Sequence, residues 1–137
     1  MRLEFSKNTR CTRAFALVIE GWNAVVQDGF TPEYFGDTPF DSSCHIMHVV
    51  SPDEDVVGVL VVREDPEACV FDIKLAYVEP SSRRQGVFRL LMEALLDRAK
   101  QTGIKTIRVT SYGEAPFAPA FAKFGLVPAA TVYERLL

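Results

Sequence analysis

The chain has few of the residues that mark secreted, membrane-spanning or metal-binding proteins. It holds three cysteines in 137 residues, and Cys11, Cys44 and Cys69 show none of the paired spacings of zinc sites. This odd number also argues against a disulfide framework. No apolar run approaches the roughly 20 residues that cross a bilayer, and Met1 to Lys7 lacks the apolar core of a signal peptide. We therefore expect a cytoplasmic protein with no metal and no membrane partner.

A large excess of charge of either sign is also absent. The chain has 15 Lys and Arg residues against 18 Asp and Glu residues, a net charge of −3, and no basic stripe. Domains that bind nucleic acid carry a clustered basic surface, so we expect no nucleic acid as a partner. The histidines, His45 and His48, fall in strand-like sequence, where residues three apart face opposite sides. They are therefore not expected to share a metal ion.

What the chain does have is the pattern of one domain, residues 1–137. A chain of this length buries about two-thirds of its unfolded surface, and 48% of its residues are hydrophobic. The first expected helix has an apolar face of Phe15, Val18, Ile19, Trp22 and Val26. Periodicity and turn residues together predict these elements: a helix from about Thr9 to Gln27, a loop over Phe30–Ser43, strands over about His45–Val50, Val56–Arg63 and Cys69–Val78, a helix from about Val87 to Gln101 that ends at Gly103, a strand over Lys105–Ser111, a short helix over Phe117–Phe124, and a last strand or hairpin arm over Val127–Leu137.

The order of these elements predicts an α+β (mixed α/β) fold. The first three strands are joined by short, turn-rich connections and are expected to be antiparallel neighbours. The strand, long helix and strand that follow predict a right-handed crossover, so the sheet is expected to be partly parallel. The run from Val56 to Val62 is apolar on both faces, as expected for a central strand covered on two sides.

The joint between the third strand and the long helix carries the most information. It reads Val78-Glu79-Pro80-Ser81-Ser82-Arg83-Arg84-Gln85-Gly86-Val87-Phe88. From Ser81 to Arg89, a segment that we call the arginine turn, it has three arginines, one glycine and no acid. A glycine-bearing turn that opens a helix aims backbone N–H groups one way, at the positive end of the helix dipole. This pattern predicts a phosphate site, and the alternative is an ordinary turn with solvated arginines.

The same residues resemble a known motif. Val-x-Pro-x-x-Arg-x-x-Gly between a strand and a helix resembles motif A of the GCN5-related N-acetyltransferases (GNAT). The chain matches five of the six positions of that family's phosphate loop and departs at Phe88, where the family usually has Gly or Ala. The Phe88 side chain either narrows the approach to the phosphates or points into the core. The segment Phe121 to Leu126 is similar to the family's Tyr-Glu-Lys-x-Gly-Phe, so the resemblance covers nearly the whole chain.

The resemblance implies a fold and a cosubstrate. The implied fold is a mixed, mostly antiparallel sheet flanked by helices, with a splayed strand pair that holds the coenzyme. The implied cosubstrate is acetyl-CoA, with its arm paired to the backbone of Ala76, Tyr77 and Val78 and with the Val78 amide as oxyanion donor. The resemblance assigns its phosphates to the arginine turn, through Arg83, Arg84, Gln85, Gly86, Val87, Phe88 and Arg89.

A general base is implied at Asp72, which matches a glutamate that deprotonates the substrate lysine in the histone-acetyltransferase branch. An aspartate within Val70-Phe71-Asp72-Ile73 is also unusual for an apolar strand. The alternatives are an exposed strand residue on a half-wet face, or a partner of Lys74. Glu79 is the other nearby carboxylate and is expected to face solvent.

The general acid is where the chain departs most from the family. The usual tyrosine is replaced by Phe121, and the usual asparagine and alanine before it by Glu114 and Phe117. Tyr112 and Tyr133 are the candidate substitutes, and the alternative for both is a rim aromatic.

The acceptor is expected to be a primary amine, on a small molecule or a protein. The loop before the strands carries an acidic, aromatic set that suits a cationic amine or is merely solvated: Glu33, Tyr34, Asp37 and Asp41. The first function hypothesis is an N-acetyltransferase that acts by direct attack in a ternary complex. The second is a non-catalytic acyl-CoA-binding module, motivated by Phe88, Glu114, Phe117 and Phe121, and the third is an interaction domain. Proteins of this fold often pair through an end strand, which is compatible with a homodimer.

Overall fold

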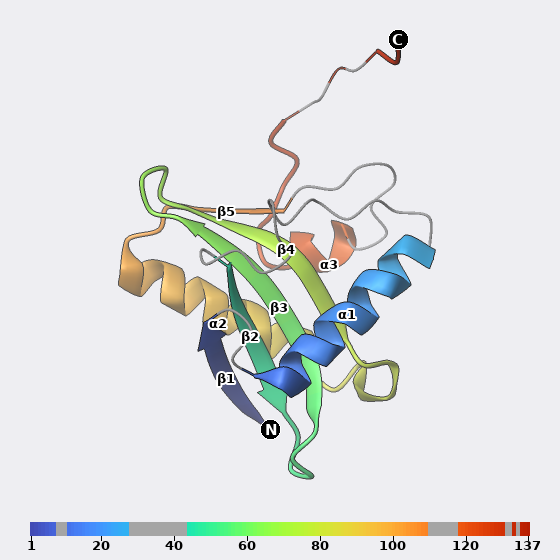
Figure 1. Ribbon diagram of the computed structural model, residues 1–137. Coiled ribbons are helices and arrows are strands. Elements are labelled where there is room, and N and C mark those ends of the chain that lie inside the picture. Colours follow the sequence, from blue (N-terminus) through green and yellow to red (C-terminus); the bar gives the residue numbers. More distant parts are fainter. Residues whose placement is uncertain (8–10, 28–43, 110–117, 131–132, 134) are drawn as a thin grey trace.

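The computed structural model describes residues 1–7, 11–27, 44–109, 118–130, 133 and 135–137 (Figure 1). Within this part of the chain, a sheet separates a helix on one face from a helix on the other (Figure 1). Its elements follow in this order: β1 (Arg2–Lys7), α1 (Thr12–Gln27), β2 (Cys44–Val50), β3 (Val56–Asp65), β4 (Val70–Val78), the 3-10 turn η1 (Pro80–Ser82), α2 (Val87–Thr102), β5 (Thr106–Val109) and α3 (Ala118–Ala122).

The described sheet is mixed and mostly antiparallel. Its strand order is β1-β2-β3-β4-β5, with β1 to β4 antiparallel and β5 parallel to β4. The parallel pair is joined by α2, as expected for a strand–helix–strand crossover. The predicted α+β class is confirmed, and so is the central place of the strand that begins at Val56.

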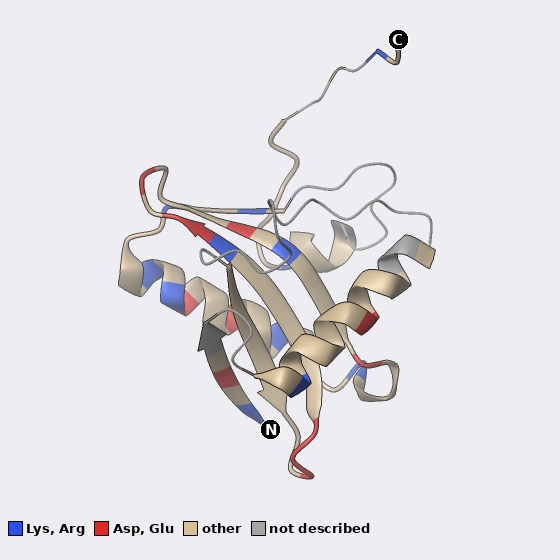
Figure 2. Cartoon of the chain, viewed as in Figure 1, with Lys and Arg blue, Asp and Glu red and all other residues tan. Residues whose placement is uncertain are grey.

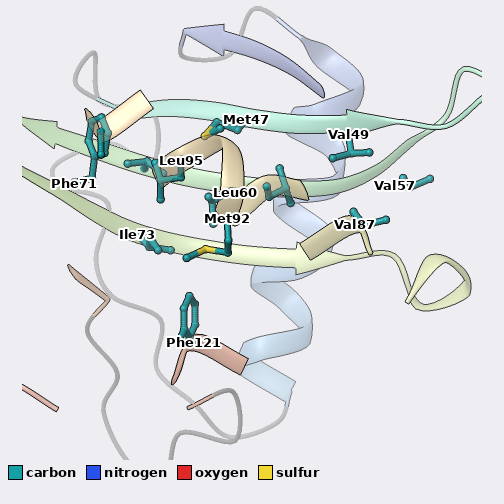
Figure 3. Close-up of a cluster of buried hydrophobic side chains, with 13 residues drawn as sticks. Met47, Val49, Val57, Leu60, Phe71, Ile73, Val87, Met92, Leu95 and Phe121 are labelled. Atoms are coloured by element: carbon teal, nitrogen blue, oxygen red, sulfur yellow. The ribbon is translucent and has the colours of Figure 1, made fainter. Parts of the chain in front are cut away.

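The core on the α2 side is built from one stripe of that helix and the facing residues of the sheet. Val87, Leu91, Met92 and Leu95 recur at helical spacing and are at most 2% exposed. They pack on side chains from the inner strands and from α3 (Figure 3). Each such side chain contributes about 1.5–3 kcal/mol on burial, so this face fixes α2, and with it the arginine turn, against β4.

The opposite face is covered by α1. Ala14, Leu17 and Val18 are buried against β2, β3 and Leu75 of β4. Gly21 lies so close to β4 that an added Cβ would sit 2.7 Å from the Tyr77 ring. A glycine is therefore needed here for the close approach of helix and strand, and α1 crosses β4 near its carboxyl end.

The predictions for the first and the last strand of the sheet were wrong. The predicted order begins with a helix, but β1 comes first and pairs with β2 from Arg2↔Val50 to Lys7↔His45. The predicted last strand over Val127–Leu137 is absent from the described residues of that segment, 127–130, 133 and 135–137. Val127 is 75% and Leu136 96% exposed, so these residues have no packing partner to hold them as a strand.

No helix among the described residues has both the length and the apolar character that a membrane crossing requires. The predicted loop over 30–43 lies outside the described residues.

Candidate functional site

The outer edge of β4 is paired along only part of its length. Pairing with β5 runs from Val70↔Thr106 to Ile73↔Val109. From residue 74 to Val78, β4 is bonded to β3 on one side and, in the described part of the chain, to no strand on the other. A strand edge of this kind presents backbone groups to which an extended ligand can pair.

A bulge begins this unpaired stretch. Val61 pairs with Leu75 and Val62 with Ile73, so Lys74 is an extra residue without a counterpart on β3. Bulges bend a strand and end regular pairing, and they are frequent beside functional sites. Here the bulge comes directly after the last described pair of β4 with β5, Ile73↔Val109, so it separates the paired half of β4 from a half that has no outer strand partner among the described residues, which we call the open half.

The backbone of the open half points away from β3 at alternate residues. The Glu79 N–H donates to the Val57 carbonyl at 2.9 Å, which places the backbone groups of Val78 and Ala76 on the other side. The Val78 carbonyl there accepts a hydrogen bond of 3.0 Å from Arg83 Nε. The N–H groups of Ala76 and Val78 are therefore aimed out of the sheet at its open edge.

The start of α2 lies at the end of this edge and carries unsatisfied donors. Gly86 is the N-cap residue, with φ at 81° and no side-chain cap. The first helical bond is from Leu90 N–H to the Gly86 carbonyl at 3.0 Å. In the described residues, the N–H groups of Val87, Phe88 and Arg89 donate to no protein acceptor. Such uncapped N–H groups at the positive end of a helix favour a bound anion.

The backbone of the arginine turn is held in an uncommon conformation with open space beside it. A Cβ added to Gly86 would meet no atom within 4 Å, so its positive φ and not crowding requires glycine. Arg84 also has a positive φ, 65°, which costs an ordinary residue about 1–3 kcal/mol. Strain of this kind persists where a ligand site needs it.

The three arginines of the turn differ in their surroundings. Arg83 is anchored: its Nε bonds the Val78 carbonyl and its guanidinium lies 5.5 Å from the centre of the Tyr77 ring. Arg89 lies 3.6 Å from Glu93, one turn along α2. The Arg84 side chain makes no hydrogen bond or ion pair with the described residues. Figure 2 shows the positive residues at the joint of β4 and α2.

The side chain of Phe88 points into the core and not over the turn. Its ring packs edge-on against Phe121 and Phe124, at centroid distances of 5.4 and 5.6 Å. Phe121 is only 5% exposed (Figure 3). Of the two alternatives for Phe88, the structure selects the core. The departure from the family pattern therefore leaves the approach to the turn open.

Asp72 lies in a line of charges across three strands. Register places it directly beside Arg63 of β3 and Arg108 of β5. Its two carboxylate oxygens lie 3.8 Å from Arg63 Nη2 and 3.4 Å from Arg108 Nε. Lys74, which the sequence offered as an alternative partner of Asp72, makes neither of these two contacts.

The remaining predicted residues are dispersed. Glu79 accepts a 3.4 Å bond from the Ser82 hydroxyl, next to the turn. Tyr133 is 91% exposed in the C-terminal segment, and no described contact brings it to β4. Other predicted residues lie outside the described residues: Glu33, Tyr34, Asp37, Asp41, Tyr112, Glu114 and Phe117.

Sequence reasoning missed a polar pair next to the turn. The Tyr77 hydroxyl donates to Glu20 of α1 at 3.4 Å, and burial, followed by the nearby Glu20 charge, raises the pKa of Tyr77. It also missed Arg63 and Arg108, because only the register of three strands brings them beside Asp72. Among the described residues, no group of three or more His, Cys, Asp or Glu could hold a metal ion.

Together, these parts are suited to a long anionic ligand with an extended arm. Unsatisfied N–H groups at α2 suit a phosphate, and the open edge of β4 beside them suits an arm that pairs like a strand.

The two histidines, His45 and His48, lie on opposite faces of β2 and have different partners. His48 bonds Glu4 at 3.0 Å, and His45 lies 3.6 Å from Glu64.

Solved structures share this architecture. A point mutant of the BH1408 protein from Bacillus halodurans matches with a TM-score of 0.73 and 17% identity, over 100% of this chain and 99% of that one. An aminoglycoside acetyltransferase from an uncultured soil sample matches with a TM-score of 0.71 and 14% identity, over 99% and 95%. Tetrahymena GCN5 matches with a TM-score of 0.69 and 18% identity, over 90% and 77%. These identities show a common fold.

No curated protein matches the sequence. The family model of the GNAT acetyltransferases matches residues 9–126, which include the open edge of β4, the arginine turn and α3. The chain therefore belongs to the acetyltransferase (GNAT) family.

Proposed function

We propose that the protein transfers an acetyl group from acetyl-CoA to a primary amine by direct attack in a ternary complex. The observation that carries this proposal is the meeting of two features: the uncapped N–H groups at Gly86 and the bare edge of β4. The first suits the coenzyme's diphosphate and the second its amide-containing arm. Family membership supports the same cosubstrate.

In the proposed reaction, the amine nitrogen attacks the thioester carbonyl carbon. A C–N bond forms, the carbonyl oxygen becomes an oxyanion, and the C–S bond then breaks to release the coenzyme thiolate. The amine gives its proton to a base, and the thiolate takes up a proton from an acid or from solvent. A thiolate is a fair leaving group without help, which agrees with a buried Phe121 that has no proton to donate.

The N–H groups of Ala76 and Val78 are the candidate oxyanion donors. Resemblance alone assigns Val78, but the carbonyl of this residue is bonded to the arginine turn, where the diphosphate end is proposed to bind. The thioester is at the far end of the arm from the diphosphate. We therefore propose the Ala76 amide as oxyanion donor and the Val78 amide as a partner of the arm. A preorganised donor of this kind contributes about 3 kcal/mol.

Asp72 remains the proposed base on β4. It lies four residues before Ala76 on the same strand, one residue before the last described pair of β4 with β5. Arg63 and Arg108 are proposed to keep its carboxylate in place.

The test compares two glycines of one helix. Gly86 and Gly103 cap the two ends of α2 with φ of 81° and 75°, and an added Cβ meets nothing at either. Gly86→Ala and Gly103→Ala should therefore cost similar stability, about 1 kcal/mol each. Only Gly86→Ala should weaken acetyl-CoA binding, by about tenfold or more, when heats of binding are measured.

A catalytic assay completes the test. Release of free thiol from acetyl-CoA in the presence of a panel of primary amines is expected for the unmodified chain. Equal coenzyme affinity in the two glycine variants would overturn the placement of the diphosphate.

A second function is favoured by one observation, the buried phenyl ring at position 121 where the family offers a hydroxyl. It is a non-catalytic module that binds acyl-CoA. Tight binding of acetyl-CoA without thiol release for any amine would select it.

A further inference from the structure

We propose that the Arg63–Asp72–Arg108 line binds an anionic group of the acceptor, so that the preferred acceptor is a small amine that also carries a carboxylate. This inference rests on the proposed function and names the substrate class of the same site. The acidic loop in the sequence suggested a purely cationic amine as the acceptor. The inference here is instead an amine that also bears a negative charge close to its nitrogen.

The first step of the argument is where the line lies. Phe71 and Ile73 on either side of Asp72 belong to the core on the α2 side, so Asp72 faces the other way. The same alternation places Arg108 on that face, because Ile107 and Val109 pack toward α2. Arg63 faces there too, since it pairs with Cys44 of the α1-side core. Figure 2 shows the positive and negative segments next to each other on β3, β4 and β5.

The second step is the distance of the line from the open edge. Among the described residues, the last pair of β4 with β5 is Ile73↔Val109, one residue after the pair Asp72↔Arg108. The proposed oxyanion donor, Ala76, is four residues from Asp72, or roughly 13 Å along an extended strand. An acceptor whose amine reaches the thioester at Ala76 would meet Arg108 only if its other end extends along β4 toward β5, so the length of the acceptor is part of the test.

The third step is charge. Two guanidinium groups flank one carboxylate, so the line carries a net positive charge. The contacts are loose: the distances from Asp72 to Arg63 Nη2 and Arg108 Nε are 3.8 and 3.4 Å. A guanidinium has five N–H donors, so most of them are not engaged by Asp72. The side chains of Arg63 and Arg108 are 36% and 55% exposed, which leaves them accessible to a ligand.

The fourth step is chemistry. A planar guanidinium matches a carboxylate with two parallel N–H···O bonds. Two half-exposed arginines that converge on one point are therefore better suited to a carboxylate than to a cation, which both would repel. Asp72 fixes the two guanidinium groups in place, and the ligand supplies the second negative charge.

The experiment compares matched amines in the thiol-release assay. The probes are glycine, β-alanine and 4-aminobutanoate against ethanolamine, 3-aminopropanol and 4-aminobutanol, which differ only in carboxylate or hydroxymethyl. We expect kcat/KM to be at least tenfold higher for at least one acid than for its alcohol. Arg108→Gln should remove that preference by raising KM for the acid much more than KM for the alcohol.

Two controls separate a local from a general effect. Lys100→Gln removes one exposed positive charge on α2 and should leave the preference intact. Arg108→Lys keeps the charge but loses the planar pair of donors, and should restore only part of the preference.

The outcomes distinguish failure of the inference from failure of the proposed function. Equal kcat/KM for acids and alcohols, or no effect of Arg108→Gln, overturns the inference and leaves the acetyltransferase standing. If no amine reacts, heats of binding of the same acids are measured with CoA present. Binding that Arg108→Gln abolishes then supports the carboxylate site without the reaction, and the absence of binding overturns it.

Discussion

The two halves of the proposed site are built in different ways. The coenzyme half comes from one continuous stretch, the end of β4 and the arginine turn, and works through backbone N–H groups at Ala76, Val78 and the start of α2. The acceptor half comes from three strands and works through the side chains of the Arg63–Asp72–Arg108 line. The first should tolerate changes of side chain and the second should not.

This difference is the basis of the two tests described above, which substitute Gly86 and Arg108. A change in backbone conformation at Gly86 acts on the coenzyme half, whereas a change in the side chain at Arg108 acts on the acceptor half. Three further experiments sharpen the comparison.

The largest effect is expected in the core under the coenzyme half. Phe88→Ala removes a ring that packs against Phe121 and Phe124, and should lower the free energy of unfolding by about 3 kcal/mol. Acetyl-CoA affinity of the folded protein should not change, because the ring does not face the turn. Denaturant unfolding and heats of binding measure the two quantities.

Phe88→Leu keeps most of the buried volume and is the control for stability. A rise in coenzyme affinity in the alanine variant would show instead that the ring obstructs the phosphates.

A smaller effect is expected in the acceptor half. Asp72→Asn should lower kcat about 100-fold, the lower end for loss of a general base, because an amide side chain cannot take up the proton of the amine. Acetyl-CoA affinity should stay the same. Steady-state kinetics with the preferred acceptor measure kcat and KM separately. An unchanged kcat with a higher KM for acids would limit Asp72 to holding the arginines.

The smallest effect concerns an ion-pair line away from the site. Arg2 bonds both carboxylate oxygens of Glu54, at 2.9 and 2.7 Å, and Glu4 at 2.9 Å. These hydrogen bonds lower the pKa of Glu54 and of Glu4 below the ordinary value of 4.5. A carboxyl with a lowered folded-state pKa adds stability above its unfolded value and loses it as pH falls through the folded one.

Stability should therefore decrease as pH falls below about 4.5. Arg2→Gln should be slightly less stable than the unmodified chain at neutral pH, and the two should converge in acid, as followed by denaturant midpoints. Coenzyme affinity at neutral pH should not differ between them. A stability gap that persists in strong acid would mean that Arg2 acts through packing and not through its ion pairs.

The parts of the fold that sequence predicted well are those set by local pattern. The three inner strands, α2 and its end at Gly103 follow from periodicity and capping residues. The first helix was predicted, and its apolar face was right only in part: Val18 is buried and Trp22 packs against the same cluster. Ile19 is 43% exposed, and the buried stripe contains Ala14, Leu17, Val18 and Gly21. Small residues face the sheet here because α1 packs closely on Tyr77, which a hydrophobicity pattern does not reveal.

The strand β1 was missed although Leu3 and Phe5 alternate with polar residues, the period of a strand. The site divides in the same way. The arginine turn is contiguous and its chemistry follows from glycine, arginine and helix polarity. The acceptor half depends on the pairs Arg63↔Asp72 and Asp72↔Arg108, and a bulge at Lys74 shifts the register by one residue. A register shift of this kind cannot be recognised from the local sequence.

The edge-on contact between Phe88 and Phe121 makes two departures from the family pattern into a single event. A large ring at position 88 needs an apolar neighbour, and a phenol at position 121 would have to bury its hydroxyl against that ring. A change at one of these positions therefore alters the surroundings of the other. An attempt to reintroduce a proton donor at position 121 should therefore start from a chain whose residue 88 has first been reduced to glycine or alanine.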